Sequence, residues 1–158
     1  MSLPTTPSQT VGPYYTIGLC RRPDNEPAPD GVHIVGTLLD GDGAPINDGM
    51  IEVWDGVGRQ WGRAGTDADG RFEFRIAKPA ASGGDAPHLD AYVFARGLLK
   101  HQRTRVYFPD EADANERDPV LSSLDAADRE TLIAREEDGA LRFDVHMQGE
   151  RQTVFFAV

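Results

Sequence analysis

The sequence has a single cysteine, no long apolar run and no secretion signal. Cys20 is the only cysteine among the 158 residues, which excludes an internal disulfide and favours a reducing compartment. No apolar stretch approaches the roughly 20 residues that a membrane-spanning helix needs. The N-terminus lacks the basic region followed by an apolar one that is typical of a signal peptide. We therefore expect a cytoplasmic protein that does not enter a membrane.

Positive charge is also scarce. Lys and Arg number 16 against 26 Asp and Glu, which gives a formal net charge of −10. Binding to nucleic acid or to an anionic membrane relies on Lys and Arg, so we expect neither as a partner. Four basic residues nevertheless gather in one stretch, at Arg96, Lys100, Arg103 and Arg105. They could bind a carboxylate, guard an edge strand or border an interface, and the residues alone leave these interpretations open.

Common catalytic motifs are missing. The sequence contains no P-loop, no dinucleotide-binding fingerprint and no Gly-x-Ser-x-Gly, each of which would predict a particular chemistry. The histidines form no His-x-His or His-Glu-x-x-His pair, so their spacing predicts no metal site. They stand at His33, His88, His101 and His146.

What is present predicts an all-β fold, a β-sandwich with an extended N-terminal arm and one or two short helices. Residues 1–30 are rich in Pro, Thr, Ser and Asp without periodicity, and we expect them to form the arm. Residues 31–158 are expected to form one β-sandwich domain. The predicted strands are Val32–Leu39, Met50–Trp54, Phe72–Ile76, Leu89–Ala95 and Thr104–Phe108. If residues 103–105 are also part of a strand, Arg103 and Arg105 should point the same way.

The C-terminal third carries the predicted helices. One helix is expected to start at Asp128 and to stop near Gly139, and a shorter helical turn is expected over Glu111–Asn115. The chain is expected to end in a hairpin of Arg142–Met147 and Thr153–Val158 around Gly149 and Glu150.

Several motifs, in order along the chain, resemble the intradiol ring-cleaving dioxygenases. The arm Thr6–Tyr14 resembles the start of these proteins, and Gly49–Asp55 and Gly62–Phe72 resemble their core. Further matches are Ala86–Leu89, Phe94–Gly97, Thr104–Phe108, Arg142–Val145, Gln148–Glu150 and Thr153–Phe156. The resemblance covers nearly the whole chain and is strongest to the alpha chains of the members that cleave protocatechuate.

This resemblance implies a chain without iron. Catalytic members of the family hold a mononuclear Fe(III) with two tyrosines and a His-x-His pair. On the corresponding strand, Pro87–Phe94, the residues nearest to that pair are Asp90 and Tyr92, and neither Gly58–Arg63 nor Lys78–Ala81 offers a ligand tyrosine. The resemblance thus implies no metal and no catalytic residue on this chain. Fe(III) would be bound by a related beta chain, in an obligate hetero-oligomer of alpha/beta pairs.

The resemblance also implies which residues meet the substrate. In the family, the alpha arm reaches into the active site of the beta chain, and the arginine of the Phe-Ala-Arg-Gly motif lies near the small aromatic substrate. The matching residues, expected to form a pocket wall shared with the beta chain, are Thr10, Gly12, Pro13, Tyr14 and Arg96.

Two alternatives remain. A self-sufficient ferric dioxygenase would need another ligand set, and alternation could place His88, Asp90 and Tyr92 on one strand face. A non-enzymatic transthyretin-like or carboxypeptidase-regulatory-like sandwich would share the Asp-x-Asp-Gly turn. Such modules lack the Gly-Pro-Tyr arm and the Phe-Ala-Arg-Gly motif. Iron analysis separates the first alternative from the alpha-chain interpretation, and co-purification with a beta chain separates the second.

Overall fold

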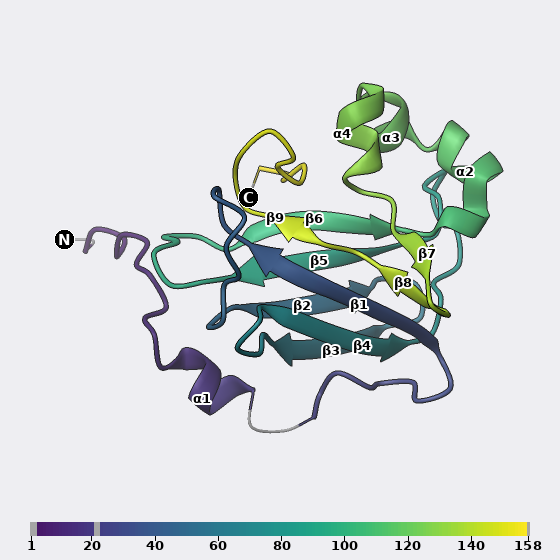
Figure 1. Ribbon diagram of the computed structural model, residues 1–158. Helices are drawn as coiled ribbons and strands as arrows, with labels where there is room; N and C mark the ends of the chain where they lie inside the picture. The colour runs from purple at the N-terminus through teal and green to yellow at the C-terminus, as the bar shows by residue number, and fades with distance from the viewer. Residues whose placement is uncertain (1–2, 21–22, 158) are drawn as a thin grey trace.

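The computed structural model describes residues 3–20 and 23–157. Two sheets pack face to face, with short helices at one end (Figure 1). One sheet has the order β4-β1-β8-β7, with β9 also paired to β1, and the other has the order β3-β2-β5-β6. The strands are β1 (Val32–Leu39), β2 (Met50–Asp55), β3 (Gln60–Gly65), β4 (Arg71–Ile76), β5 (His88–Phe94), β6 (Gln102–Tyr107), β7 (Arg135–Glu137), β8 (Ala140–Arg142) and β9 (Val145–His146). The predicted all-β sandwich is confirmed.

Alternation of side chains along the strands creates the core. In β4, Phe72, Phe74 and Ile76 are buried while Arg71 and Glu73 are exposed, as expected for a strand with one solvated face. The buried faces of the two sheets meet in one hydrophobic cluster. A second, smaller cluster lies beneath the helices and includes Tyr107 and Leu121.

The helices are short and lie mostly between β6 and β7. A 3₁₀ turn, Pro109–Glu111, leads into α2 (Ala112–Arg117), α3 (Pro119–Ser122) and α4 (Ala126–Glu130). The helical turn predicted over Glu111–Asn115 is confirmed by α2. No helix in the described residues is long and apolar enough to cross a membrane.

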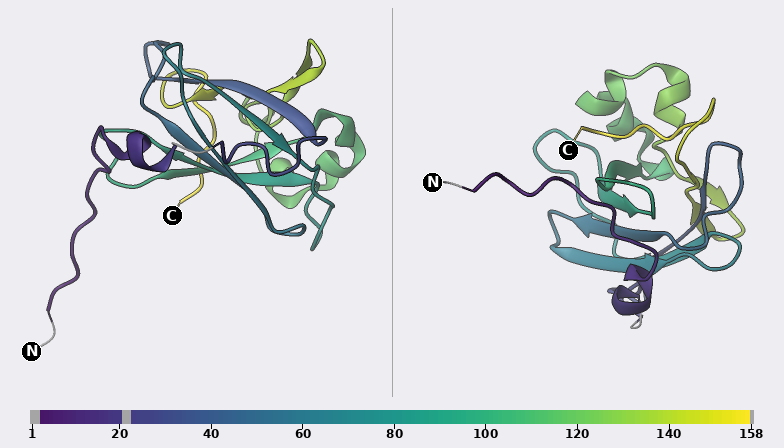
Figure 2. Two further views of the ribbon diagram at one scale, coloured as in Figure 1. Left: turned by 90° about the horizontal axis from the view of Figure 1, so that it is seen from below. Right: turned by 90° about the vertical axis from the view of Figure 1, so that its left-hand side faces the viewer.

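The N-terminal segment is extended except for one short helix, α1 (Tyr15–Leu19). Before this helix the chain runs away from the sandwich into solvent (Figure 2). After it, the chain returns along the edges of both sheets. The N–H of Arg63 in β3 donates to the carbonyl of Asp24, and the N–H of Arg75 in β4 donates to the carbonyl of Asn25. The returning segment therefore covers two edges that would otherwise expose unpaired backbone groups.

Two predictions for the C-terminal third are wrong. The helix expected from Asp128 to Gly139 ends at Glu130, because the chain beyond it pairs with the end of β6. Tyr107 N–H donates to the carbonyl of Leu132, and Ala134 N–H donates to the carbonyl of Tyr107. Residues Arg135–Glu137 then form β7 instead of a helix.

The terminal hairpin is the second error. β8 and β9 pair in parallel with β1, and residues Thr153–Ala157 form no strand; Val158 lies outside the described residues. The last segment crosses to the other sheet, where Phe156 bridges to Arg103, because Val154 and Phe156 pack against the cluster beneath the helices. Strand β3 and helix α1 were not predicted.

Candidate functional site

The arm is fastened to the sandwich at the end of β5. The Gly97 N–H donates to Thr10 Oγ1 at 3.0 Å. The Tyr15 hydroxyl lies 2.7 Å from the carbonyl oxygen of Asp48 and 2.8 Å from that of Phe94. These contacts place the predicted site residue Thr10 beside the Phe-Ala-Arg-Gly turn, which carries Arg96.

Between those two anchors lie Gly12, Pro13 and Tyr14. Gly12 has φ of +77°, a left-handed conformation that glycine adopts readily and other residues seldom do, so the chain turns here rather than running straight into the proline. Pro13 is exposed. Tyr14 is 77% exposed, with its ring in solvent rather than in the core. In this position Tyr14 offers a flat apolar ring and a hydroxyl to a neighbouring molecule.

Arg96 pairs with an acid at the same end of the sheet. Its Nε lies 2.9 Å from Asp48 Oδ2, and the exposed fractions of the two side chains are 66% and 17%. Arg96 therefore faces solvent but is held from behind by a mostly buried carboxylate. The nearest hollow is a groove of about 430 Å³ between the arm and the β5–β6 turn, lined by Ser8, Gln9, Val11, Phe94, Ala95, Leu98, Leu99, Lys100 and His101.

The structure thus brings Thr10 and Arg96 together but does not close a pocket around the five predicted residues. The largest hollow described, about 660 Å³, lies elsewhere, against β3, β4 and β1, and includes none of them. Its basic residues already have acidic partners, such as Glu52 for Arg63 and Asp144 for Arg142.

The predicted basic cluster is not one site. Arg96 pairs with Asp48, whereas Arg103 and Arg105 both contact Asp90, which confirms that these two point the same way. Asp90 lies within β5, and Arg96 follows six residues later in the turn after this strand, up to about 20 Å away at the usual rise of a strand. The two groups occupy opposite ends of one sheet face.

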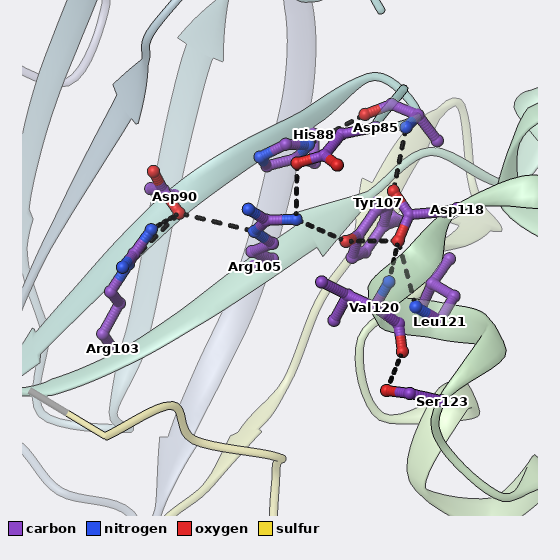
Figure 3. Close-up of polar contacts among 11 residues, drawn as sticks. Asp85, His88, Asp90, Arg103, Arg105, Tyr107, Asp118, Val120, Leu121 and Ser123 are labelled. Carbon is purple, nitrogen blue, oxygen red and sulfur yellow. Dashed lines mark hydrogen bonds and ion pairs between the residues drawn. The ribbon is translucent and has the colours of Figure 1, made fainter. Parts of the chain in front are cut away.

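The far end of that face is a closed network of charges around Arg105 (Figure 3). Arg105 Nη1 donates to the Tyr107 hydroxyl at 3.0 Å and lies 3.1 Å from Asp85 Oδ2, and its Nε is 3.7 Å from Asp90 Oδ1. Arg103 Nη2 donates to the same Asp90 oxygen at 2.9 Å. Burial opposes the charge of Arg105, but its hydrogen bond to Tyr107 and the nearby carboxylates outweigh this and raise its pKa.

A ferric ion does not fit this network. His88, Asp90 and Tyr92 share the outer face of β5, as alternation predicted. Asp90, however, already neutralises two guanidinium groups, and a cation beside Arg105 would be repelled. Burial raises the pKa of Tyr107, and the Asp118 carboxylate adds to this against the opposing effect of Arg105. The Tyr107 hydroxyl accepts a hydrogen bond from Arg105 and donates one to Asp118, so both neighbours already engage it.

No other metal centre emerges from residues 3–20 and 23–157. Nowhere in them do three or more His, Cys, Asp or Glu side chains form a group that could hold a metal ion. In His88, Nδ1 lies 2.8 Å from the carbonyl oxygen of Ala86, so this nitrogen carries a proton that it donates. The guanidinium groups of Arg103 and Arg105 at the far end of the face are thus paired with carboxylates of the same chain.

Asp118 anchors this network to the helices. Its carboxylate is fully buried and accepts hydrogen bonds from the N–H groups of Ala86, Val120 and Leu121 and from the Tyr107 hydroxyl. Asp118 caps α3, with Pro119 at the first helical position, a typical helix start. The Asp-Pro pair could have revealed this cap in the sequence, although its contact with Tyr107 depends on the tertiary fold.

The comparisons with solved structures define the class. An intradiol ring-cleavage dioxygenase from Tetranychus urticae matches 91% of this chain and 93% of its own length, at 14% identity and a TM-score of 0.61. The dioxygenase domain of a carbohydrate-binding fusion protein from Streptomyces sp. SirexAA-E matches 91% and 98%, at 22% identity and a TM-score of 0.56. The fold is that of the intradiol dioxygenases. No protein-family model matches the sequence.

Curated relatives narrow the class further. The protocatechuate 3,4-dioxygenase alpha chain of Burkholderia cepacia is 40% identical over 99% of both chains, and that of Pseudomonas putida is 39% identical over 98% of this chain and 96% of its own. The beta chain from Burkholderia cepacia is 28% identical over 82% and 69%. The chain belongs to the family of protocatechuate 3,4-dioxygenase alpha chains. The alignment with the Burkholderia cepacia alpha chain spans 195 positions. This chain has only 158 residues, so the alignment contains gaps in this chain.

The buried anchor gives a test of the network. We expect Asp118→Ala to lower the free energy of unfolding by about 3 kcal/mol, because it removes a helix cap and leaves several buried donors without an acceptor. The matched control is Asp125→Ala. Asp125 is exposed and caps α4 through a single hydrogen bond from the Asp128 N–H, so its loss should cost about 1 kcal/mol. Denaturant unfolding followed by circular dichroism measures both, and equal losses would contradict the anchoring role.

Proposed function

We propose that this chain works as the alpha subunit of an alpha/beta protocatechuate 3,4-dioxygenase and supplies part of the substrate pocket to the beta chain. The enzyme cleaves protocatechuate (3,4-dihydroxybenzoate) with O₂ between the two hydroxylated carbons and yields 3-carboxy-cis,cis-muconate. One observation carries the proposal. Tyr14 projects at 77% exposure from a turn of the arm that is fastened on both sides, by Thr10 and by Tyr15.

The pocket wall in this proposal consists of Thr10, Gly12, Pro13, Tyr14 and Arg96. Residues 1–30 act as an arm and residues 31–158 as the sandwich that carries it. Protocatechuate has a carboxylate and becomes more anionic when its hydroxyls ionise. A guanidinium such as that of Arg96 favours such a charge. Tyr14 offers a flat apolar ring and a hydroxyl, which suit an aromatic ring with polar groups.

Intradiol dioxygenases use non-heme iron, and we propose that the beta chain holds it as Fe(III). The donor set of this chain supports this assignment, because Asp90 is engaged by two arginines. When bound, the iron supplies the activation of the catechol ring toward O₂. The role of this chain is to bind and orient the substrate beside it. We further propose that the pair works in the cytoplasm, which agrees with the single cysteine.

Neither alternative has support. The ligand set suggested for a self-sufficient dioxygenase contains Asp90, and that carboxylate is neutralised by Arg103 and Arg105. A transthyretin-like module without enzymatic function is contradicted by two alpha-chain relatives that match at 39–40% identity over nearly the whole chain.

Metal analysis of separated chains tests the division of labour. Purified without its partner, this chain should be colourless and contain no iron. Mixed with the beta chain at micromolar concentration, it should co-elute in gel filtration and give protocatechuate-dependent O₂ uptake. Stoichiometric ferric iron on the isolated chain, or two chains that elute independently, would contradict the proposal.

Two substitutions of Tyr14 test the arm. Tyr14→Phe keeps the ring and removes the hydroxyl, whereas Tyr14→Ala removes both. We expect both assembled variants to keep their iron while kcat/KM for protocatechuate falls by roughly tenfold for Ala, and less for Phe, because a wall of the pocket is lost. The control is Ile17→Ala, which truncates another exposed side chain of the same segment. Ile17 lies on α1 and is 54% exposed. If Tyr14→Ala dissociated the complex and Tyr14→Phe left the kinetics unchanged, Tyr14 would be an anchor and not part of the pocket.

A further inference from the structure

Asp48 and Arg96 meet just beyond the paired ends of β2 and β5. The last pair of this ladder is Met50 with Phe94. Asp48 lies in the turn two residues before β2, and Arg96 lies in the turn two residues after β5. The side chains meet there, with Arg96 Nε 2.9 Å from Asp48 Oδ2. Among the described residues, no group forms a hydrogen bond of good geometry with this buried oxygen. Arg96 is therefore its partner through charge.

Tyr15 connects the same two strand ends to the arm. Its hydroxyl hydrogen is shared between the carbonyl oxygens of Asp48 and Phe94, at 2.7 and 2.8 Å. Burial and, next, the Asp48 carboxylate raise the pKa of Tyr15, which keeps this hydroxyl a donor. Tyr15 directly follows Tyr14, so a single side chain joins the arm to both strands. Neither Asp48 nor Tyr15 was a predicted site residue; the adjacent aromatics of the arm were the available signal.

We propose that Asp48 is a positioning residue for Arg96, and that Asp48 and Tyr15 form a clamp that sets Arg96 and Tyr14 in fixed relation to each other. The inference rests on the proposed function, in which Arg96 and Tyr14 face the substrate. An arginine with a 66% exposed side chain would otherwise sample many rotamers, and ordering it on binding costs affinity.

The geometry of the ion pair also selects how a ligand approaches. Asp48 contacts the Nε side of the guanidinium. A second carboxylate can then use the two terminal nitrogens, whose parallel N–H groups match its two oxygens. The clamp therefore orients Arg96 for end-on recognition of an aromatic carboxylate. It should have little effect on a catechol that carries no carboxylate.

Kinetics of the assembled alpha/beta enzyme test the clamp. Asp48→Asn keeps the size of the side chain and removes its charge. We expect KM for protocatechuate to rise by about tenfold with kcat within about twofold, since the interaction lost is one of uniform binding. KM for catechol, which lacks the carboxylate, should stay unchanged. Asp48→Glu should restore part of the loss. The matched control is Asp69→Asn, which breaks the exposed pair of Asp69 with Arg71 and should change neither constant.

A double-mutant cycle separates the clamp from the function on which it rests. If Asp48 acts through Arg96, then Asp48→Asn should have no further effect on KM in an Arg96→Ala background. A large effect of Arg96→Ala with none of Asp48→Asn would overturn the clamp and leave the pocket assignment intact. No effect of Arg96→Ala would overturn both. Additive effects, or equal effects on protocatechuate and catechol, would show that Asp48 is merely structural.

Should Asp48→Asn fail to assemble, Tyr15→Phe gives a second test. It leaves the Asp48 charge in place and removes only the shared hydroxyl. We expect a smaller, carboxylate-dependent rise in KM, because the arm is then less firmly tied to the strand ends. A change confined to thermal stability, with KM unaltered for both substrates, would overturn the part assigned to Tyr15.

Discussion

The antiparallel pairing of β2 with β5 is the interaction on which the rest of the molecule depends. On the inner face it buries Ile51, Val53, Ala91 and Val93 in the core between the sheets. Beyond one end of this pairing, Asp48 and Arg96 contact each other from the two adjoining turns. A shift of the register by one residue would expose the apolar side chains. Burial of the core therefore fixes which strand ends, and hence which turns, lie side by side.

Charge is organised differently at the two ends of that outer face. Around Arg105, the charges are paired within the chain: the guanidinium of Arg105 is the cation, and Asp85 and Asp90 are its carboxylate partners. Around Arg96, the guanidinium is held by one carboxylate and is largely open to solvent. In the function we propose, this open guanidinium takes part in recognition of the anionic aromatic substrate, while the paired charges around Arg105 do not.

Sequence patterns predicted the strands with regular alternation well. Val32–Leu39 matches β1 residue for residue, and the Phe72–Ile76 alternation appears as β4, because one-sided burial imposes a period of two. The region after Asp128 was misjudged since Leu132 and Ala134 bond to Tyr107, a long-range contact that no local propensity contains. The site was partly predictable. Thr10 and Arg96 came from motif resemblance, whereas Asp48 required the side-by-side placement of two turns and Tyr15 required the course of the arm.

In the function we propose, the arm of this chain completes a pocket on the beta chain. A photoreactive benzoylphenylalanine at position 14 of the assembled enzyme tests this on irradiation. We expect a cross-link to the beta chain, mapped by mass spectrometry to residues near its iron, and we expect protocatechuate to suppress this cross-link. A cross-link formed only within this chain, or one to the beta chain that protocatechuate does not affect, would contradict it.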